Sequence, residues 1–95
     1  MTYYLSASTR KDKKFMIETP NGKIIHFGAY GYADYTIHRD DERKERYIKR
    51  HERREDWDNP ETAGFWSYWL LWNKPTIQKS IVDVEYLFNI NIVMD

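Results

Sequence analysis

The fold is decided by one continuous stretch of the chain, Phe15-Met16-Ile17-Glu18-Thr19-Pro20-Asn21-Gly22-Lys23-Ile24-Ile25-His26-Phe27. Asn21 and Gly22 stand between two runs of β-forming residues, and both residue types tolerate the positive φ angles of a tight turn. The stretch therefore predicts a β-hairpin over residues 13–28. Alternation gives each strand one apolar face for packing against helices, formed by Phe15, Ile17, Ile25 and Phe27.

On either side of the hairpin the pattern becomes irregular. Residues 1–12 show no clear period, and we expect an irregular N-terminal arm before the domain at residues 13–95. Residues 28–35 form a loop rich in Gly and Tyr, whose two glycines suit a tight turn or a close backbone approach. A phosphate cradle is the alternative, but the loop lacks the third glycine and the Lys-Ser/Thr pair of a P-loop.

The next segment, residues 40–54, predicts a highly charged helix. It contains no Gly or Pro, and acidic residues at its start are followed by seven Lys or Arg in residues 43–54, an order that complements the helix dipole. Only Tyr47, Ile48 and His51 offer an inward face. Five arginines recur at steps of three and four and should share one face: Arg39, Arg43, Arg46, Arg50 and Arg53.

Two more helices are expected in the C-terminal half. Residues 57–61 break the charged helix, and Thr62 can cap a second helix over residues 63–72, which is apolar nearly all round. Its spacing places three aromatic residues on one face, namely Phe65, Trp69 and Trp72. Thr76 can cap a third helix.

These elements define an α+β fold, a small single domain in which a β-hairpin packs against about three helices. Residues 89–93 alternate and predict a short final strand added to the hairpin. The length of 95 residues suits one domain, because two cores would have fewer than about 50 residues each. Aromatic residues make up 17% of the chain and supply enough core to exclude disorder despite 32% charged residues.

The composition also excludes several kinds of chemistry. The chain has no cysteine, which rules out disulfides, thiolate zinc ligands and a cysteine nucleophile. His26, His38 and His51 match no compact metal-ligand spacing. No apolar run approaches the roughly 20 residues of a membrane span. We therefore predict a non-enzymatic protein without metal, cofactor, membrane span or small-molecule substrate.

The charges sum to zero but are unevenly distributed along the chain. Residues 1–54 contain 13 Lys or Arg against 8 Asp or Glu, whereas residues 55–95 contain 2 against 7. This asymmetry suits self-association or docking to another charged molecule. The alternative is that both halves fold together and mix their charges on one surface.

The arginine stripe is the main candidate site. Guanidinium groups form bidentate bonds with carboxylates of a protein partner or with phosphates of DNA or RNA, and Tyr30 and Tyr32 in the adjoining loop would extend such a surface. The structural alternative is a solvated helix face held by pairs at i,i+4. Those pairs would be Asp40–Lys44, Glu42–Arg46 and Glu45–Lys49.

Three segments resemble a family of short uncharacterised proteins encoded by large nucleocytoplasmic DNA viruses. They are HFGAYGYADYTIH (residues 26–38), DERKERYIKRH (41–51) and the tryptophan-rich TAGFWSYWLLWNKPT (62–76), and the likeness covers roughly residues 13–82. The resemblance implies no enzymatic activity for this chain. It implies a viral origin, and with it a role in virion architecture, genome packaging or interference with the host.

Residues and resemblance together favour a virion structural component, such as a minor capsid or cement protein, in the virion or the infected-cell cytoplasm. Its Arg-rich helix and Tyr loop would contact other viral structural proteins or further copies of the chain. A nucleic-acid-binding protein that places the same arginines on phosphates is the first alternative. A host-directed inhibitor is the second.

Overall fold

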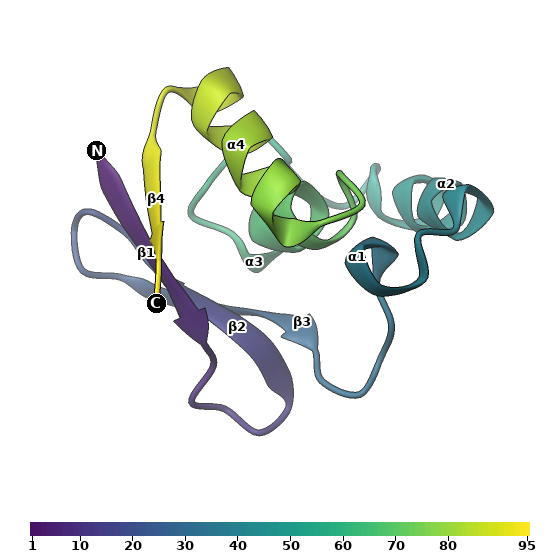
Figure 1. Ribbon diagram of the computed structural model, residues 1–95, viewed down its shortest axis with the longest axis horizontal. Helices are drawn as coiled ribbons and strands as arrows, with labels where there is room; N and C mark the ends of the chain where they lie inside the picture. Colours follow the sequence, from purple (N-terminus) through teal and green to yellow (C-terminus); the bar gives the residue numbers. More distant parts are fainter.

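The computed structural model describes all 95 residues and places the helices on one side of a four-stranded sheet (Figure 1). The strands are β1 (Thr2–Ala7), β2 (Lys13–Glu18), β3 (Ile24–Ala29) and β4 (Asn91–Met94). Their order in the sheet is β3-β2-β1-β4, with antiparallel pairing except between β1 and β4, which are parallel. The α+β fold is confirmed.

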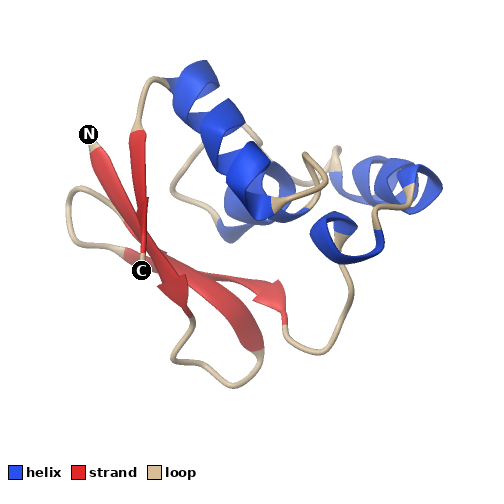
Figure 2. Cartoon of the chain, viewed as in Figure 1, coloured by secondary structure: helices blue, strands red, loops and turns tan.

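The helical part consists of α1 (Tyr35–His38), α2 (Asp41–His51), α3 (Ala63–Trp66), a π-helical turn η1 (Ser67–Leu71) and α4 (Ile77–Phe88). Figure 2 shows α2 at the opposite end of the molecule from the N- and C-terminal strands. None of these helices combines the length and the apolar character needed to cross a membrane.

The hairpin prediction is confirmed. The N–H of Thr19 donates to the carbonyl of Lys23 at 2.8 Å, and Gly22 lies at φ 87°, where glycine carries no Cβ penalty. Phe15 lies opposite Phe27 in the register, with ring centroids 5.9 Å apart. These two rings belong to the face of the hairpin that meets the helices.

The N-terminal segment differs from the expected irregular arm, because Thr2–Ala7 forms a central strand. Tyr3 pairs with Ile92 of β4 on one side, and Leu5 pairs with Ile17 of β2 on the other. Leu5 is completely buried. The final strand, β4, also pairs with β1 and not with the hairpin, so the first and last strands of the chain are neighbours in the sheet.

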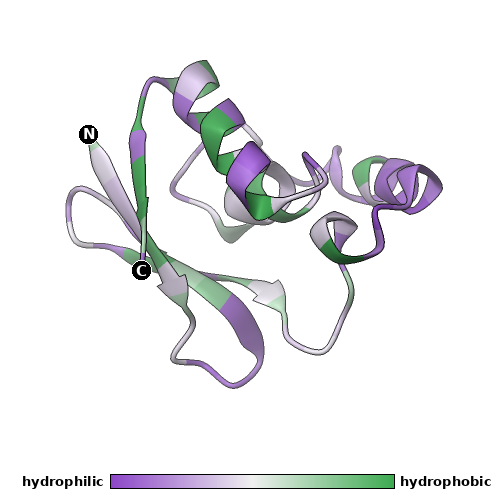
Figure 3. Ribbon diagram, viewed as in Figure 1, coloured by the Kyte–Doolittle hydropathy of each residue, from purple (hydrophilic) through white to green (hydrophobic).

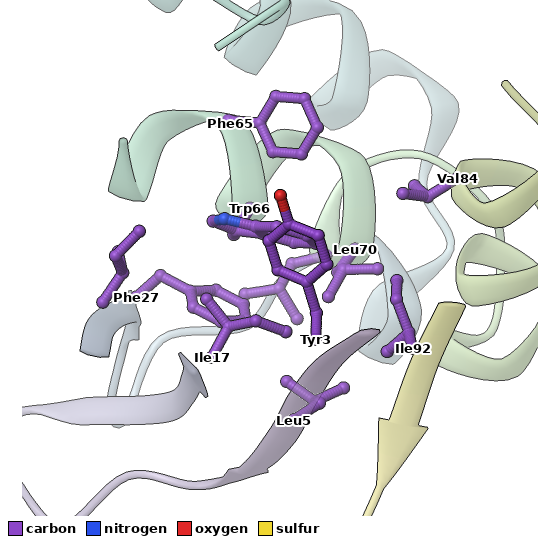
Figure 4. Close-up of a cluster of buried hydrophobic side chains, with 11 residues drawn as sticks. Tyr3, Leu5, Ile17, Phe27, Phe65, Trp66, Leu70, Val84 and Ile92 are labelled. Carbon is purple, nitrogen blue, oxygen red and sulfur yellow. The ribbon is translucent and has the colours of Figure 1, made fainter. Parts of the chain in front are cut away.

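The core lies between the sheet and the helices, and Trp66 occupies its centre (Figure 4). This indole is fully buried, contacts the ring of Tyr3 at a centroid distance of 5.2 Å, and donates its Nε1–H to the carbonyl of Pro60 at 2.8 Å. That bond satisfies the one polar atom of the side chain and so offsets the cost of removing it from water. The tryptophan-rich segment thus anchors the helices to the sheet.

The predicted helix starts are confirmed by their capping bonds. Thr62 accepts from the N–H of Phe65 at 3.2 Å, and Thr76 accepts from the N–H of Lys79 at 3.2 Å. Asp40 accepts from two backbone N–H groups at the start of α2. Each cap satisfies donors that the first helical turn leaves unpaired.

The predicted face of the tryptophan-rich helix is wrong at its end. Trp69 and Phe65 share a face and both contact Phe88, as the spacing indicated. Trp72 instead stacks on Tyr47 of α2. The reason is η1, because a π turn holds more residues than an α turn and rotates the following side chains away from the 3.6-residue pattern.

Candidate anion-binding site

A cavity of about 600 Å3 lies between the end of the hairpin and helix α2. Five basic side chains line it, two from β2 and three from α2: Lys13, Lys14, Arg43, Arg46 and Arg50. Only two carboxylates, those of Asp34 and Glu55, line the same space, so its walls carry a net charge of +3. Apolar surface comes from Phe27, Leu71 and Trp72.

Helix α2 presents its three arginines to the cavity because of where it begins and which residue anchors it. The Asp40 carboxylate fixes the start by accepting from the N–H of Arg43 at 3.3 Å. Tyr47 is the only buried residue of the helix. Positions 43 and 50 lie four and three residues from position 47 and share its face, and position 46 lies beside them, so with the Tyr47 ring buried all three exposed arginines line the cavity.

Three stacked rings attach α2 to the rest of the chain. Tyr47 lies parallel to Trp72, with a centroid distance of 4.4 Å and an interplanar angle of 4°. His51 stacks on Tyr47 at 4.3 Å. Figure 3 shows the α2 ribbon as largely hydrophilic with one hydrophobic stretch, and Tyr47 is its only buried residue, so this contact supplies most of the apolar attachment.

Lys44 adds a polar attachment on the neighbouring face of α2. Its ammonium donates to the carbonyl of Asn73 at 2.6 Å and lies 4.9 Å from the centroid of the Tyr35 ring. Burial lowers the pKa of Lys44 below its ordinary value. This lysine therefore holds the helix in place and does not belong to the cavity.

On the sheet side, one ion pair shapes the cavity wall. The Lys14 ammonium lies 2.6 Å from a carboxylate oxygen of Asp34, and both side chains are largely buried. The other oxygen of Asp34 caps α1 by accepting from the N–H of Thr36. Since Asp34 is used twice within the fold, it neutralises Lys14 and is not available to the other cations of the cavity.

The charges of the arginines are almost entirely uncompensated. Lys13, Arg43 and Arg50 have no carboxylate oxygen within 4.0 Å. Of the three pairs expected at i,i+4, only Glu42–Arg46 forms, at 3.9 Å and between exposed side chains. The expectation of a solvated helix face held together by such pairs is therefore wrong for most of its members.

The second carboxylate of the cavity, Glu55, is packed into its wall. A Cβ built on Gly64 would clash with this carboxylate, so the absence of a side chain at position 64 makes room for it. Its charge contributes to raising the pKa of Tyr47, although burial is the larger cause. Burial also lowers the pKa of His51, with Arg54 and Arg50 acting in the same direction and Glu55 opposing them, which favours the neutral imidazole.

The structure brings together four of the seven residues predicted for partner binding. Arg43, Arg46, Arg50 and Tyr32 line the cavity. Arg39 adopts a left-handed conformation after α1 and donates to the carbonyl of Pro75, and Arg53 lies beyond the end of α2. Tyr30 is exposed on the side of the basic N-terminal turn.

Sequence reasoning missed the sheet side of the site. Lys13 and Lys14 belong to a basic cluster at residues 10–14 that continues into the first strand of the hairpin, and this cluster was the available signal. Ser67 and Leu71 reach the cavity through the π turn, which no local pattern indicated. The cavity is thus formed by segments that are distant in sequence.

The histidines lie apart from one another. The Nδ1 atom of His26 is 2.8 Å from the hydroxyl of Ser8, and Nδ1 of His38 accepts from the N–H of Asp40. His51 is the last residue of α2. No group of three potential ligands among His, Asp and Glu gathers at one point.

Residues 3–51 match a family of unknown function (DUF5754), and the chain belongs to this family. The matched part contains all but the first residue of β1, together with the hairpin, α1 and α2, and thus all five basic residues of the cavity. No curated protein and no solved structure matches the chain. The segments at residues 26–38 and 41–51 fall inside the match, whereas the tryptophan-rich segment at 62–76 lies outside it.

Proposed function

We propose that the protein is a non-enzymatic binding protein whose cavity holds an acidic segment of a partner protein. The observation that carries this proposal is the concentration of Lys13, Arg43, Arg46 and Arg50 around one concave space, in which only Arg46 has a carboxylate within 4.0 Å, that of Glu42 outside the cavity. Like charges gathered in this way destabilise the unbound protein, and an anionic partner relieves the repulsion. Guanidinium groups suit carboxylates because they form two parallel hydrogen bonds to each.

The shape of the site supports a peptide segment as the ligand. The cavity combines cationic walls with apolar surface from Phe27, Leu71 and Trp72, and such a surface accommodates the aliphatic parts of Asp and Glu side chains. Partial enclosure also strengthens each ion pair relative to one on an open surface. Tyr47 and His51 serve as packing groups in this proposal, because their rings stack on each other beside the arginines.

The resemblance of residues 26–38, 41–51 and 62–76 to proteins of large DNA viruses supports a role for this binding in the assembly of a virus particle. In that setting the protein is a minor capsid or cement component that joins other subunits through their acidic segments. Replacing Arg43, Arg46 and Arg50 with Glu should leave the circular dichroism spectrum unchanged and abolish incorporation into particles. Incorporation at the wild-type level would contradict the virion assignment.

Binding can be tested directly with a labelled synthetic peptide of alternating Glu and Val, about eight residues long. The triple variant R43E/R46E/R50E should bind it at least ~10-fold more weakly than the wild type. A matched control is K49E/R53E/R54E, which makes the same change in net charge outside the cavity and should retain most of the affinity. Equal losses in the two variants would show that net charge and not the cavity determines binding.

Single-stranded nucleic acid is the second candidate, favoured by the position of the tyrosines. Tyr32 lines the cavity and is 74% exposed, and Tyr30 is 69% exposed, so both rings are available to stack on bases. A single-stranded oligonucleotide should then bind with an affinity that falls steeply as salt rises, and Tyr32→Ala should weaken it. Absence of oligonucleotide binding at low salt would remove this candidate.

A further inference from the structure

Strand β3 is an edge of the sheet, and its outer side has free backbone groups. Ile25 and Phe27 direct their backbone N–H and C=O groups toward β2. Because these groups alternate in direction along an antiparallel strand, those of Ile24 and His26 point away from the sheet. Neither residue makes a backbone hydrogen bond elsewhere in the chain. Such an edge is a template for one more strand.

The free edge of β3 leads directly into the basic cavity. Phe27, Gly28 and Ala29, at the C-terminal end of the strand, form part of its wall. Figure 1 shows α2, which carries the three arginines, on the same side of the molecule as this end of β3. A segment that continues the sheet along β3 therefore arrives between the strand and the arginines.

We propose that the acidic partner segment binds as an extended strand added to the edge of β3. This inference rests on the proposed function and specifies how the segment is held. Main-chain hydrogen bonds to Ile24 and His26 supply affinity that does not depend on sequence. Because side chains alternate along a strand, every second residue of the segment faces the arginines, and these positions carry the carboxylates.

Neither a second copy of the chain nor a nucleic acid fits both this edge and the cavity. Residues 24–29 contain no acidic residue, so pairing with β3 of a second copy would bring no carboxylate to Arg43, Arg46 or Arg50. Nucleic acid would neutralise the arginines but has no peptide backbone to extend the ladder. Only an acidic polypeptide satisfies both the edge and the cavity.

A substitution at His26 separates the backbone contribution from that of the side chain. His26→Pro removes the outward N–H, and proline is tolerated at such positions of edge strands. His26→Val keeps the N–H and loses the same imidazole contact with Ser8. With the alternating Glu-Val peptide as probe, His26→Pro should bind at least ~10-fold more weakly, and His26→Val should stay within about 2-fold of the wild type.

A second measurement keeps the proposal testable if His26→Pro fails to fold. Versions of the Glu-Val peptide that are N-methylated at single positions are titrated against the wild-type protein. Strand addition predicts that methylation weakens binding at alternate positions only, because every second peptide N–H points toward β3. The amides of Ile24 and His26 should also gain protection from hydrogen exchange when the peptide is bound.

The outcomes distinguish this inference from the proposed function. If R43E/R46E/R50E abolishes peptide binding while His26→Pro and N-methylation have no effect, the cavity function stands and strand addition is wrong. If the peptide does not bind the wild type at all, both are wrong. If the chain alone forms a dimer that protects Ile24 and His26, the occupant of the edge is a second copy and the inference is overturned.

Discussion

Gly28 is the residue at which backbone conformation and packing constrain the cavity most tightly. It lies at φ 80°, and a Cβ there would come within 2.8 Å of Leu71 Cδ1 and 3.3 Å of Lys14 Cβ. Both neighbours belong to the cavity wall. A side chain at this position would therefore combine backbone strain with overpacking.

Gly28→Ala should lower the free energy of unfolding by about 2–4 kcal/mol, since left-handed strain costs about 1–2 kcal/mol and overpacking a similar amount. Gly22→Ala is the control, because Gly22 has a similar φ of 87° and no atom within 4 Å of its Cβ position. Gly22→Ala should therefore lose only the part of the free energy of unfolding that left-handed backbone strain costs. Equal losses for the two variants in urea unfolding would contradict the close packing against Leu71.

At the scale of the elements, α2 depends on one aromatic contact for its position. Tyr47 is buried between Trp72 and His51, and the rest of the helix is mostly charged. Tyr47→Ala should therefore cost about 3 kcal/mol and release α2 from the body. Hydrogen exchange should then become fast in α2 while the sheet remains protected.

The control for this prediction is Tyr47→Phe, which keeps the ring stack. No hydrogen bond involves the Tyr47 hydroxyl, and its loss should change stability by less than about 1 kcal/mol. Uniform loss of protection in both α2 and the sheet of Tyr47→Ala would contradict the idea that α2 is a separately attached element.

Local signals explain which elements could be predicted from the sequence. The Asn21-Gly22 turn identified the hairpin, and threonines at 62 and 76 identified two helix starts, because turns and caps are formed by neighbouring residues. The π turn and the short helix α1 were missed. A helix of four residues has too few positions to display a period, and η1 alters the period that the prediction assumed.

The same reasoning applies to the candidate site. The steps of three and four correctly grouped Arg43, Arg46 and Arg50, since these residues belong to one helix. Arg39 and Arg53 were wrongly assigned to the same face because the helix starts after Asp40 and ends at His51, which removes both from its regular part. The sheet contributes Lys13 and Lys14 to the cavity through tertiary packing, and the spacing of residues within a helix gives no information about such contacts.

At the scale of the whole molecule, the N-terminal strand β1 joins the hairpin to the C-terminal strand β4 in one sheet. β1 lies between β2 and β4, and it brings residues from both ends of the chain into one sheet. Its role was not predicted, because six residues with mixed polarity give a weak pattern and the partner strand lies at the far end of the chain. The N-terminal segment is therefore part of the core and not an arm.

Leu5→Ala tests this arrangement. Leu5 is fully buried, so its truncation should cost about 2–5 kcal/mol in the free energy of unfolding. Tyr4→Ala, on the solvent side of the same strand, should cost clearly less because the ring is 48% exposed. Thermal or urea unfolding measures both losses. A negligible effect of Leu5→Ala would contradict the central position of β1 and favour an irregular N-terminal arm.

The central claim is that one basic cavity receives an acidic segment. The most direct measurement is an NMR titration of the isotope-labelled protein with the alternating Glu-Val peptide. The account predicts that the amide signals of Lys13, Gly28, Arg46 and Arg50 shift together and saturably, while those of α4 remain unchanged. Shifts centred on α4 or β4, or no saturable shift at any residue, would contradict it.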